Sequence, residues 1–342
     1  MELTMKIRLA ISGAGFIADI YAKAVHAHKK DCEIVALVEI FPEVSRRFTS
    51  KFNIPRFYTD LEALLKDGEV DVLIIGTPNF LHAPQSIAAL HAGVAVMIEK
   101  PMAMNAQEAQ MMLDTSKQTG AILMVAHCWR FDKEINWLRE QAKSGKLGKI
   151  IRTKGYGVHA NWGPSGWFTK KDTAGGGALV DMGIHALDTA RYLQGDPQPI
   201  SVYAHLGTFY KDFDVDDTGI IIVKWDNGSV SYIESGWWQP HMDGPEASTQ
   251  LYGTQAFGSV FPTRLEIPDP AKQRIKQIDG DFPYPREEHC PQEMYNDQLD
   301  YFIECVRTKK TPVPGGLEGF INMKIVDAAY ESTRTGQVGE IH

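Results

Sequence analysis

A short apolar run near the start of the chain leads directly into a glycine turn with the pattern G-x-G-x-x-A at residues 13–18. The run has the β-branched character of a strand, and helical spacing begins at Phe16. Gly13 and Gly15 allow a close approach of the backbone, and the free N–H groups and dipole of a helix N-terminus attract a pyrophosphate. The turn therefore predicts a dinucleotide site, with a ligand-free strand-to-helix connection as the alternative.

The first third of the chain alternates short apolar runs with longer stretches of helical spacing. The runs lie at 7–12, 33–39, 71–76, 92–99 and 121–126. Strands that alternate with helices are joined by right-handed crossovers into a parallel sheet, which holds ligands at the carboxyl ends of its strands. We therefore expect a doubly wound α/β domain over residues 1–126.

Beyond residue 126 the pattern changes to strand-like runs in succession. Asp226-Asn227-Gly228 stands between two β-branched runs, and Asn-Gly tolerates the positive φ angles of a tight hairpin turn. Helical patterns accompany these runs at 133–141, 291–307 and 317–335. We expect an α+β domain with an antiparallel sheet over residues 127–342.

Composition excludes several classes of partner and site. The 342 residues carry a formal net charge of −8, which provides no basic field for a nucleic-acid backbone. The chain has no apolar run of membrane-spanning length and no leader pattern at its start, so we expect neither a membrane span nor an export signal. The 4 cysteines form no C-x-x-C pair, which argues against a disulfide framework and a cysteine-rich zinc site. We expect a cytoplasmic protein with a small, weakly charged substrate and no metal.

A carboxylate follows the second apolar run of the first domain. Glu39 stands about 20 residues beyond the glycine turn, where an acidic side chain accepts hydrogen bonds from ribose hydroxyls and repels a 2′-phosphate. A solvated carboxylate is the alternative, and Arg46 and Arg47 leave some room for NADP. The position of Glu39 favours NAD.

Polar residues also follow the third and fourth runs. The third ends in T-P-N-F-L-H at residues 77–82, and the fourth ends in E-K-P at residues 99–101. A lysine at the carboxyl end of a strand, facing a cofactor, is a candidate for catalysis because its ammonium can stabilise a developing alkoxide. Taken alone, Lys100 is more often a surface charge.

A glycine run at 175–177 precedes a helical pattern that carries Asp181 and His185. Residues four apart share a helix face, so both side chains can point into one cleft with Lys100. Oxidation of an alcohol needs a base with a pKa near neutrality, which histidine provides. A packed histidine satisfied by the aspartate is the alternative. Zinc held by these two residues and His159 is disfavoured, because no H-E-x-x-H or cysteine ligand pattern accompanies them.

The four motifs at 13–18, 77–82, 99–101 and 175–188 together resemble, in order and spacing, the glucose-fructose oxidoreductase, inositol dehydrogenase and rhizopine-catabolism (Gfo/Idh/MocA) family. The resemblance implies a Rossmann domain and an α+β domain with a large open, mainly antiparallel sheet, through which subunits form homo-dimers or homo-tetramers. It also implies an NAD-dependent dehydrogenase, with NADP as the less favoured cofactor. Its reaction would move a hydride between nicotinamide and a secondary alcohol or ketone of a cyclitol, monosaccharide or related polyol.

Two other functions stay open. Some members of the family oxidise a sugar transiently with bound NAD and then eliminate a glycosidic group, so the chain could be a glycosidase. Others have lost catalytic residues and act as NAD-responsive regulatory proteins.

The resemblance also assigns roles by position. Lys100 matches the lysine at the nicotinamide, His185 the proton acceptor, and Asp181 the aspartate that contacts substrate or orients that histidine. Residues expected to line the cofactor are Gly13, Gly15, Phe16, Ile17, Glu39, Thr77, Pro78, Asn79, His82, Glu99 and Lys100. Residues expected to contact the substrate, besides Lys100, Asp181 and His185, are His159, Asn161, Trp162, Trp167 and Trp237. Cys128 and Trp129 depart from the family, because many relatives have polar or basic residues there.

Overall fold

The computed structural model describes residues 6–28, 30–240 and 245–342, which divide into two compact units. The first unit comprises the described residues up to Cys128 together with Cys290–Phe320. The second comprises the described residues of Trp129–His289 and Ile321–His342. Residues 1–5, on which the expectation of no leader segment depends, lie outside the described residues.

The units differ from the predicted division at residue 126 in one segment. Cys290–Phe320 follows the first part of the second unit in the chain but belongs to the first unit. Its helix α9 (Gln292–Thr308) packs along α1 (Phe16–Ala27). Tyr295 meets Tyr21 edge to face there, with the ring centroids 5.9 Å apart. Packing between the apolar faces of α1 and α9, which are distant in sequence, therefore places this late segment in the first unit.

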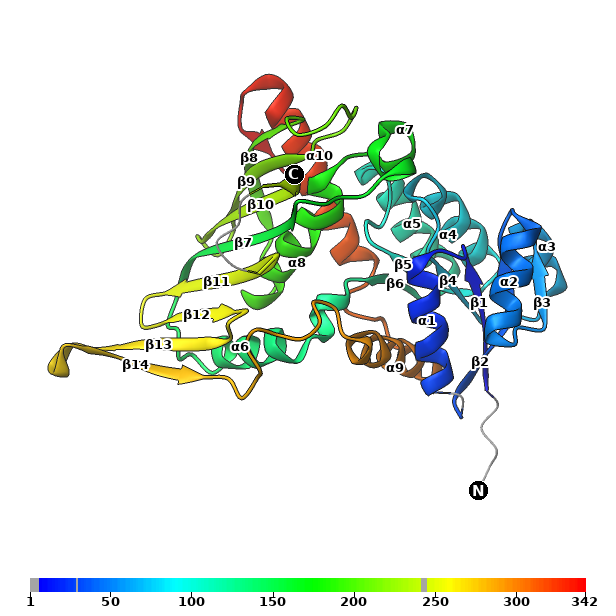
Figure 1. The fold of residues 1–342 in the computed structure, drawn as a ribbon, viewed down its shortest axis with the longest axis horizontal. Helices are drawn as coiled ribbons and strands as arrows, with labels where there is room; N and C mark the ends of the chain where they lie inside the picture. The colour runs from blue at the N-terminus through cyan, green and yellow to red at the C-terminus, as the bar shows by residue number, and fades with distance from the viewer. Residues whose placement is uncertain (1–5, 29, 241–244) are drawn as a thin grey trace. The chain divides into compact units, whose positions relative to one another are not determined.

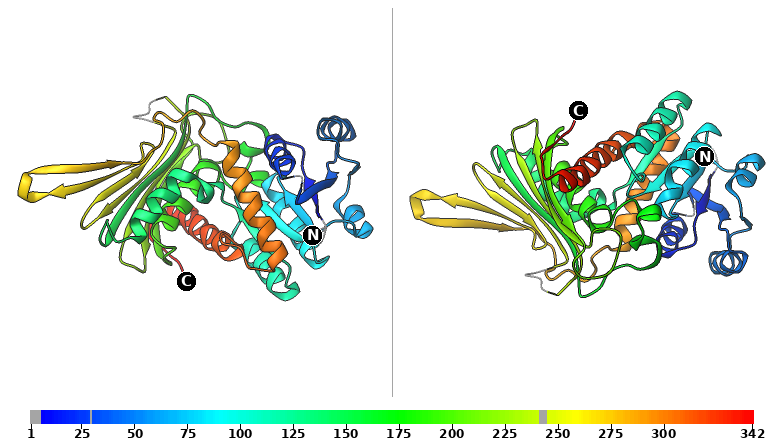
Figure 2. Two further views of the ribbon diagram at one scale, coloured as in Figure 1. Left: turned by 90° about the horizontal axis from the view of Figure 1, so that it is seen from below. Right: turned by 90° about the horizontal axis from the view of Figure 1, so that it is seen from above.

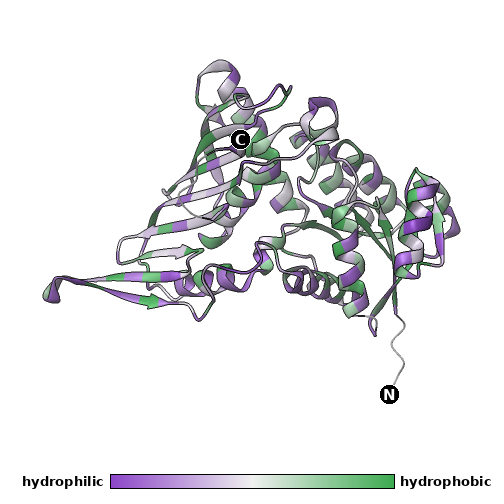
Figure 3. Cartoon of the chain, viewed as in Figure 1, coloured by the Kyte–Doolittle hydropathy of each residue, from purple (hydrophilic) through white to green (hydrophobic). Residues whose placement is uncertain are grey.

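The first unit is a doubly wound α/β domain, which confirms the predicted fold (Figure 1). Its strands are all parallel, in the order β3-β2-β1-β4-β5-β6. They are β1 (Ile7–Ser12), β2 (Cys32–Val38), β3 (Arg56–Tyr58), β4 (Val72–Ile75), β5 (Ala95–Glu99) and β6 (Leu123–Ala126). The helices between them are α1, α2 (Pro42–Phe52), α3 (Leu61–Asp67), α4 (His82–His91) and α5 (Ala106–Thr119). The central strands are buried on both faces and read as continuous apolar runs, as Figure 3 shows.

The second unit contains a mixed sheet in the order β14-β13-β12-β11-β7-β10-β9-β8-β15. Every neighbouring pair is antiparallel except β7 and β10, which run parallel. The strands are β7 (Ile150–Ala160), β8 (Pro199–Gly207), β9 (Thr218–Trp225), β10 (Val230–Gln239), β11 (Ala247–Gly253), β12 (Phe257–Val260), β13 (Arg264–Asp269), β14 (Arg274–Asp279) and β15 (Gly339–Glu340). Helices α6 (Lys133–Lys143) and α8 (Ile184–Leu193) pack on the sheet, and α10 (Gly316–Thr335) runs along the same face in both views of Figure 2.

The hairpin predicted at residues 226–228 joins β9 to β10 and is confirmed. Gly228 has a φ of +83°, and its N–H donates to the carbonyl of Trp225. The first strand after the hairpin pairs with β7 in a parallel register, so that the carboxyl ends of β7 and β10 reach the same edge of the sheet. The strands β9 and β11 begin at that edge, because both run antiparallel to these two. Loops that are far apart in sequence thus gather at one end of the second unit.

No helix in the described part of the chain is long and apolar enough to cross a membrane.

Candidate functional site

The glycine turn in the first unit is built for close backbone contact. Gly13 has a φ of +91°, and a Cβ atom there would lie 2.8 Å from the carbonyl oxygen of Gly76. A Cβ on Gly76 would in turn lie 2.7 Å from the side chain of Ile17. Gly15 precedes the first residue of α1, and no side chain caps that helix. The N-terminus of α1 is therefore open to an anion.

Large apolar side chains stand exposed around this turn, at the carboxyl ends of β1 and β2. Phe16 is 83% exposed, Ile40 is 66% exposed and Phe41 is 54% exposed. A cluster of exposed apolar side chains beside an uncapped helix N-terminus fits the flat, apolar parts of a dinucleotide together with its pyrophosphate. These residues therefore fit the NAD that the glycine turn predicts. Ile40 and Phe41 were not among the predicted site residues, although their place after β2 is a usable signal.

Glu39 lies beside the glycine turn, where the sequence predicts it. Its carboxylate accepts hydrogen bonds from the N–H of Ala14 at 3.2 Å and from the N–H of Phe41 at 3.1 Å. A cavity of about 440 Å³ adjoins the same turn, and its lining includes Arg47 and Lys51. Lys51 is paired with Asp19. The negative charge at the turn and the arginine beside it are the two opposing influences on the choice between NAD and NADP.

The loop after β4 carries Thr77, Pro78, Asn79 and His82 and leads into α4. Asn79 is buried, and Thr77 donates a long hydrogen bond of 3.4 Å to the side chain of Gln85. Gln85 also accepts a hydrogen bond of 2.8 Å from Ser12, the last residue of β1. The carboxyl ends of β1 and β4 are therefore joined through one glutamine.

His82 is buried between two loops of the first unit. Its Nδ1 lies 2.8 Å from the carbonyl oxygen of Pro101, and its Nε2 lies 2.9 Å from the carbonyl oxygen of Thr77. Burial lowers the pKa of His82 from 6.5 to about 4, although both carbonyls favour the charged ring. The imidazole thus ties the loop after β4 to the residue that follows Lys100.

The pKa of His82 predicts acid sensitivity of the first unit. The unfolded histidine binds a proton below pH 6.5 while the folded one stays neutral down to about 4, so protonation in this window favours unfolding. The contribution to the free energy of unfolding is complete above pH 6.5 and falls by roughly 3 kcal/mol as the pH drops to 4. Urea unfolding followed by circular dichroism at several pH values measures this fall in the wild type and in His82→Gln.

Burial also lowers the pKa of His289 to about 4, so the wild type and His82→Gln share that contribution. The difference between the two proteins then reports His82 alone. We expect the two stability curves to converge as the pH falls from 6.5 to 4. Curves that stay parallel over this range would exclude the assigned role.

Glu99 and Lys100 end β5. The carboxylate of Glu99 accepts a hydrogen bond of 2.5 Å from the hydroxyl of Tyr21 and one of 3.2 Å from the backbone N–H of Lys100. Burial raises the pKa of Glu99, and the hydrogen bond from Tyr21 opposes that rise. Tyr21 is fully buried on α1, and its hydroxyl also lies 3.1 Å from Gln298 of α9. The backbone at Lys100 is therefore fixed by groups from two helices.

In the second unit, Asp181 lies in a π-helical turn (Leu179–Gly183), and His185 lies in the first turn of α8. The sequence predicts an ordinary helix here, so the π turn differs from the prediction, and the glycine run just before it is closely packed. A Cβ on Gly177 would lie 1.8 Å from the carbonyl oxygen of Asp216, and one on Gly176 would lie 2.0 Å from the hydroxyl of Tyr330. Single π turns inside helices are frequent at functional sites.

Asp216 caps this helical segment from a distant loop. Its carboxylate accepts 2.8 Å hydrogen bonds from the N–H groups of Gly177 and Leu179 and a 2.7 Å bond from the hydroxyl of Tyr330. Its carbonyl oxygen accepts from the N–H of Ala178. Burial raises the pKa of Asp216, while these hydrogen bonds lower it. Sequence reasoning did not identify Asp216, because a helix cap supplied from a distant loop leaves no local pattern.

Trp237 holds the carboxylate of Asp181. The indole Nε1 donates a 3.0 Å hydrogen bond to Oδ2 of Asp181, and the backbone N–H of Trp237 donates to the carbonyl of Asp217. The Trp237 side chain is fully buried, in a cluster with Ala178, Met182 and Val215. The residue that sequence reasoning placed in the substrate pocket therefore orients the candidate catalytic aspartate.

An indole also covers the candidate base. The ring of Trp129 stacks on His185 with the centroids 5.1 Å apart and an angle of 23° between the planes. The edge of His289 meets the same indole at 5.4 Å. The indole of Trp129 therefore fixes the orientation of the candidate base from one side.

Asp188, the last residue of the glycine-rich motif, is engaged in a buried ion pair. Both of its carboxylate oxygens accept hydrogen bonds from the guanidinium of Arg130, at 2.7 and 2.8 Å. Asn322 donates a further bond of 3.0 Å to the same carboxylate. Asp188 therefore joins α8 to the segment after β6 and to α10.

The end of β7 and the loop after it carry three of the predicted substrate residues, His159 in the strand and Asn161 and Trp162 in the loop. Glu246 accepts hydrogen bonds from the indole of Trp162 at 2.7 Å and from the N–H of Ala160 at 2.9 Å, and its second oxygen lies 3.3 Å from Nδ1 of His159. Asn161 has a φ of +59°, and its N–H donates to the carbonyl of Gln239. One carboxylate thus organises this loop.

The fourth of these residues, Trp167, lies in a 3₁₀ turn (Gly166–Thr169) farther along the same connection. Its ring stacks on Phe168 with the centroids 3.8 Å apart.

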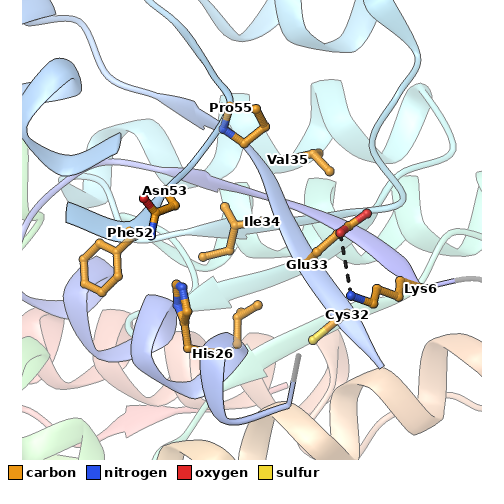
Figure 4. Close-up of a pocket in the computed structure, with 10 residues that line it drawn as sticks. Lys6, His26, Cys32, Glu33, Ile34, Val35, Phe52, Asn53 and Pro55 are labelled. Atoms are coloured by element: carbon orange, nitrogen blue, oxygen red, sulfur yellow. Dashed lines mark ion pairs between the residues drawn. The ribbon is translucent and has the colours of Figure 1, made fainter. Parts of the chain in front are cut away.

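A second cavity, of about 390 Å³, lies elsewhere in the first unit (Figure 4). Its lining comes from the start of β2 and the ends of α1 and α2, and Lys6 and Glu33 form an ion pair of 3.9 Å at its edge. Burial raises the pKa of the Cys32 thiol in this lining to about 11, so the cysteine is a poor nucleophile. This cavity is at the opposite end of β2 from Glu39 and contains no predicted site residue.

Among the described residues, no group of three or more His, Cys, Asp or Glu side chains is arranged to hold a metal ion.

Comparison with known proteins identifies the family of both units. Residues 7–127 match the model of the oxidoreductase family with an NAD-binding Rossmann fold, and residues 135–257 match the GFO/IDH/MocA C-terminal domain. The chain is 28% identical to D-glucoside 3-dehydrogenase of Escherichia coli K12, over 96% of each chain. It is 30% identical to D-xylose 1-dehydrogenase (NADP(+)) 2 of Haloferax volcanii, over 85% of this chain and 86% of that protein.

Solved structures share the fold. Levoglucosan dehydrogenase in complex with NADH and levoglucosan superimposes with a TM-score of 0.89 at 22% identity, over 98% of this chain and 100% of that one. The family models and the relatives together cover both units. The chain belongs to the Gfo/Idh/MocA family of NAD(P)-dependent oxidoreductases.

Proposed function

We propose that the chain is an NAD-dependent dehydrogenase that oxidises a secondary alcohol of a pyranose sugar or cyclitol, with Lys100, Asp181 and His185 as its catalytic residues. The observation that carries the proposal is the fixed state of Asp181 and His185, one held by Trp237 and the other stacked on Trp129. Catalytic groups need such supporting contacts, because small displacements are costly in rate. Membership of the family and relatives that act on glucosides and xylose support the choice of substrate class.

The three residues divide the work of alcohol oxidation. NAD, when bound, supplies the acceptor for the hydride that leaves the carbinol carbon. The hydroxyl proton must be lost as well, and the imidazole of His185 is the side chain type among the three that most often serves as a general base. The ammonium of Lys100 stabilises negative charge on the substrate oxygen, and Asp181 orients the histidine or a substrate hydroxyl. In the reverse direction the same groups protonate the oxygen of a ketone.

The cofactor would lie on residues of the first unit. Gly13, Gly15 and the open N-terminus of α1 suit the pyrophosphate, and Phe16 and Ile17 begin that helix. The carboxylate of Glu39 would accept hydrogen bonds from the ribose hydroxyls. The remaining lining would come from the ends of β4 and β5, namely Thr77, Pro78, Asn79, Glu99 and Lys100, with His82 fixing these two loops from beneath.

An absorbance screen at the NADH band tests the reaction. NAD or NADP is offered with methyl glycosides, inositols, aldoses and ketoses. Accumulation of the reduced cofactor with one of these alcohols supports the proposal. Release of an aglycone without net NADH would replace it with the glycosidase that oxidises its substrate transiently. Cofactor binding without any conversion would replace it with a regulatory protein.

We expect Glu39→Ser to raise the ratio of kcat/KM with NADP to kcat/KM with NAD by about 10-fold, or roughly 1.4 kcal/mol. The substitution removes a negative charge that would meet the 2′-phosphate and leaves Arg47 nearby. Steady-state kinetics with both cofactors measure the ratio. Glu43→Ser, which removes a charge from the exposed first turn of α2, serves as the control and should leave the ratio unchanged. Equal kcat/KM values of the wild type with NAD and NADP would contradict the role of Glu39 in choosing NAD.

We also propose that two copies of the chain associate through the open face of the nine-stranded sheet. Tyr203, Ile222 and Tyr232 stand side by side on β8, β9 and β10, and the first two are 42% and 39% exposed. A row of large apolar side chains across a sheet is typical of an interface. Sedimentation velocity should give the mass of a dimer or tetramer, and a monomer at micromolar concentration would contradict this assembly.

The cysteines Cys32, Cys128, Cys290 and Cys305 form no disulfide, which supports the proposal of a reducing, cytoplasmic location.

A further inference from the structure

Trp162 is an exposed indole that is held in one orientation. Its side chain is 47% exposed, yet its Nε1 donates a 2.7 Å hydrogen bond to Glu246. One face of its ring lies on the imidazole of His159, with the centroids 3.5 Å apart and the planes 28° from parallel. The backbone is fixed as well, because its carbonyl oxygen accepts a 2.8 Å hydrogen bond from the N–H of Trp238. The orientation of the indole is therefore fixed. His159 covers one face of the ring, and other parts of the ring are open to solvent.

Glu246 is the centre of this arrangement. Its carboxylate receives Trp162, the N–H of Ala160 and the ring of His159, so that one side chain fixes both stacked rings. An exposed side chain normally keeps its rotamer freedom, and ordering it has a cost in entropy. Here the contacts within the folded chain have already ordered the side chain before a ligand binds. The free face of the indole is therefore a preorganised surface for a ligand.

The segment that carries this surface is connected to the candidate catalytic aspartate through two neighbouring tryptophans of the second unit. Trp238 donates its N–H to Trp162, and the residue before it, Trp237, donates its indole N–H to Asp181. A Cβ on Gly163 would lie 3.0 Å from Cβ of Trp237, so the two segments are in close contact. The segment that carries Trp162 therefore packs against the segment whose Trp237 holds Asp181.

A flat, fixed indole binds a ring that presents C–H groups or a π face, because such rings lose little on leaving water and gain dispersion contacts over a wide area. In the proposed reaction the sugar ring that is oxidised lies at Asp181 and His185, so an indole on a neighbouring segment of the same unit is suited to what is attached to that ring. We propose that Trp162 is the platform for a second ring of the substrate, and that the protein acts on glycosides whose aglycone is an aromatic ring or another sugar. This inference rests on the proposed dehydrogenase function.

Substrates that differ in the aglycone alone test the platform. Methyl, phenyl and cellobiose-type β-glucosides share the same glucose ring, so their kcat/KM values separate the contribution of the second ring. We expect Trp162→Ala to lower the ratio of kcat/KM for the phenyl substrate over the methyl substrate by about 10-fold. The disaccharide shows whether a second sugar gains the same advantage as an aromatic aglycone. Trp162→Phe, which keeps a ring but loses the hydrogen bond to Glu246, should restore part of the ratio.

Tyr284→Ala is the matched control, because Tyr284 is an exposed aromatic residue elsewhere in the second unit. It should leave the ratio unchanged. An equal loss for methyl and phenyl substrates in Trp162→Ala would overturn the platform and leave Trp162 as a structural residue. An unchanged ratio would overturn it as well.

Isothermal titration separates this inference from the proposed function. Phenyl and methyl glucosides are titrated into the wild type and Trp162→Ala in the presence of NADH, which permits binding without oxidation. Weaker binding of the phenyl substrate alone to the variant supports the platform even if no glycoside is oxidised. Equal binding of both glucosides to both proteins overturns the platform even if the dehydrogenase activity is found.

Discussion

His185→Ala is expected to lower kcat by about 10²- to 10⁴-fold, which is the range for removal of a general base. The variant loses the imidazole that accepts the hydroxyl proton, whereas the glycine turn and Glu39, which would hold the cofactor, are in the other unit. Affinity for NADH should therefore change little. Steady-state kinetics and a fluorescence titration with NADH measure the two quantities on the same preparation.

The control for this substitution is His91→Ala, which removes an exposed histidine at the end of α4. It should retain the kcat of the wild type. A loss confined to NADH binding in His185→Ala, with kcat preserved at saturating cofactor, would refute the assignment of the base.

Asp188→Ala is expected to destabilise the second unit by about 3 kcal/mol. The substitution leaves the buried guanidinium of Arg130 without its bidentate partner, and breaking such a pair costs about 3 to 5 kcal/mol. The lower end applies because Asp196 stays 2.9 Å from the same guanidinium. All 7 tryptophans lie between residues 129 and 238, so urea unfolding followed by tryptophan fluorescence reports this unit.

Two further variants check the cause. Glu331→Ala breaks an exposed ion pair with Arg334 and should leave the unfolding midpoint close to that of the wild type. The double substitution Arg130→Met with Asp188→Leu removes both charges and should recover much of the lost stability. An Asp188→Ala protein with a wild-type midpoint would show that the buried pair contributes nothing.

Much of the fold could be predicted from the sequence, because its signals are local. The glycine turn, the alternating runs of the first unit and the Asn-Gly hairpin at 226–228 each depend on neighbouring residues. The short edge strand Arg56–Tyr58 and the ribbon formed by β13 and β14 were not predicted. The side chains of β14 are largely exposed, and β3 and β13 lack a run of buried apolar side chains. The return of α9 to the first unit was also missed, because its partner α1 is distant in the chain.

The candidate site shows the same division. Asp181 and His185 could be found from a motif and from the chemistry of their side chains. The contacts that fix them could not, because Trp237, Trp129 and Asp216 act across long separations in sequence. Trp237 was predicted as a substrate residue since aromatic rings often line sugar pockets, and the structure shows a buried side chain whose indole N–H donates to Asp181. The type of a side chain could predict that it lies near the site. It could not predict the direction in which the side chain points.

The most direct test of the account is the origin of the hydrogen that reaches nicotinamide. A glucoside deuterated at each carbinol carbon of the ring is mixed with the protein and NAD, the reaction is quenched within one turnover, and the reduced cofactor is analysed by mass spectrometry. The account predicts NADH that carries one deuterium in the wild type and almost none formed by the Lys100→Met, His185→Ala double variant. Reduced cofactor without deuterium would contradict it. The same amount of deuterated NADH from the wild type and from the double variant would contradict it as well.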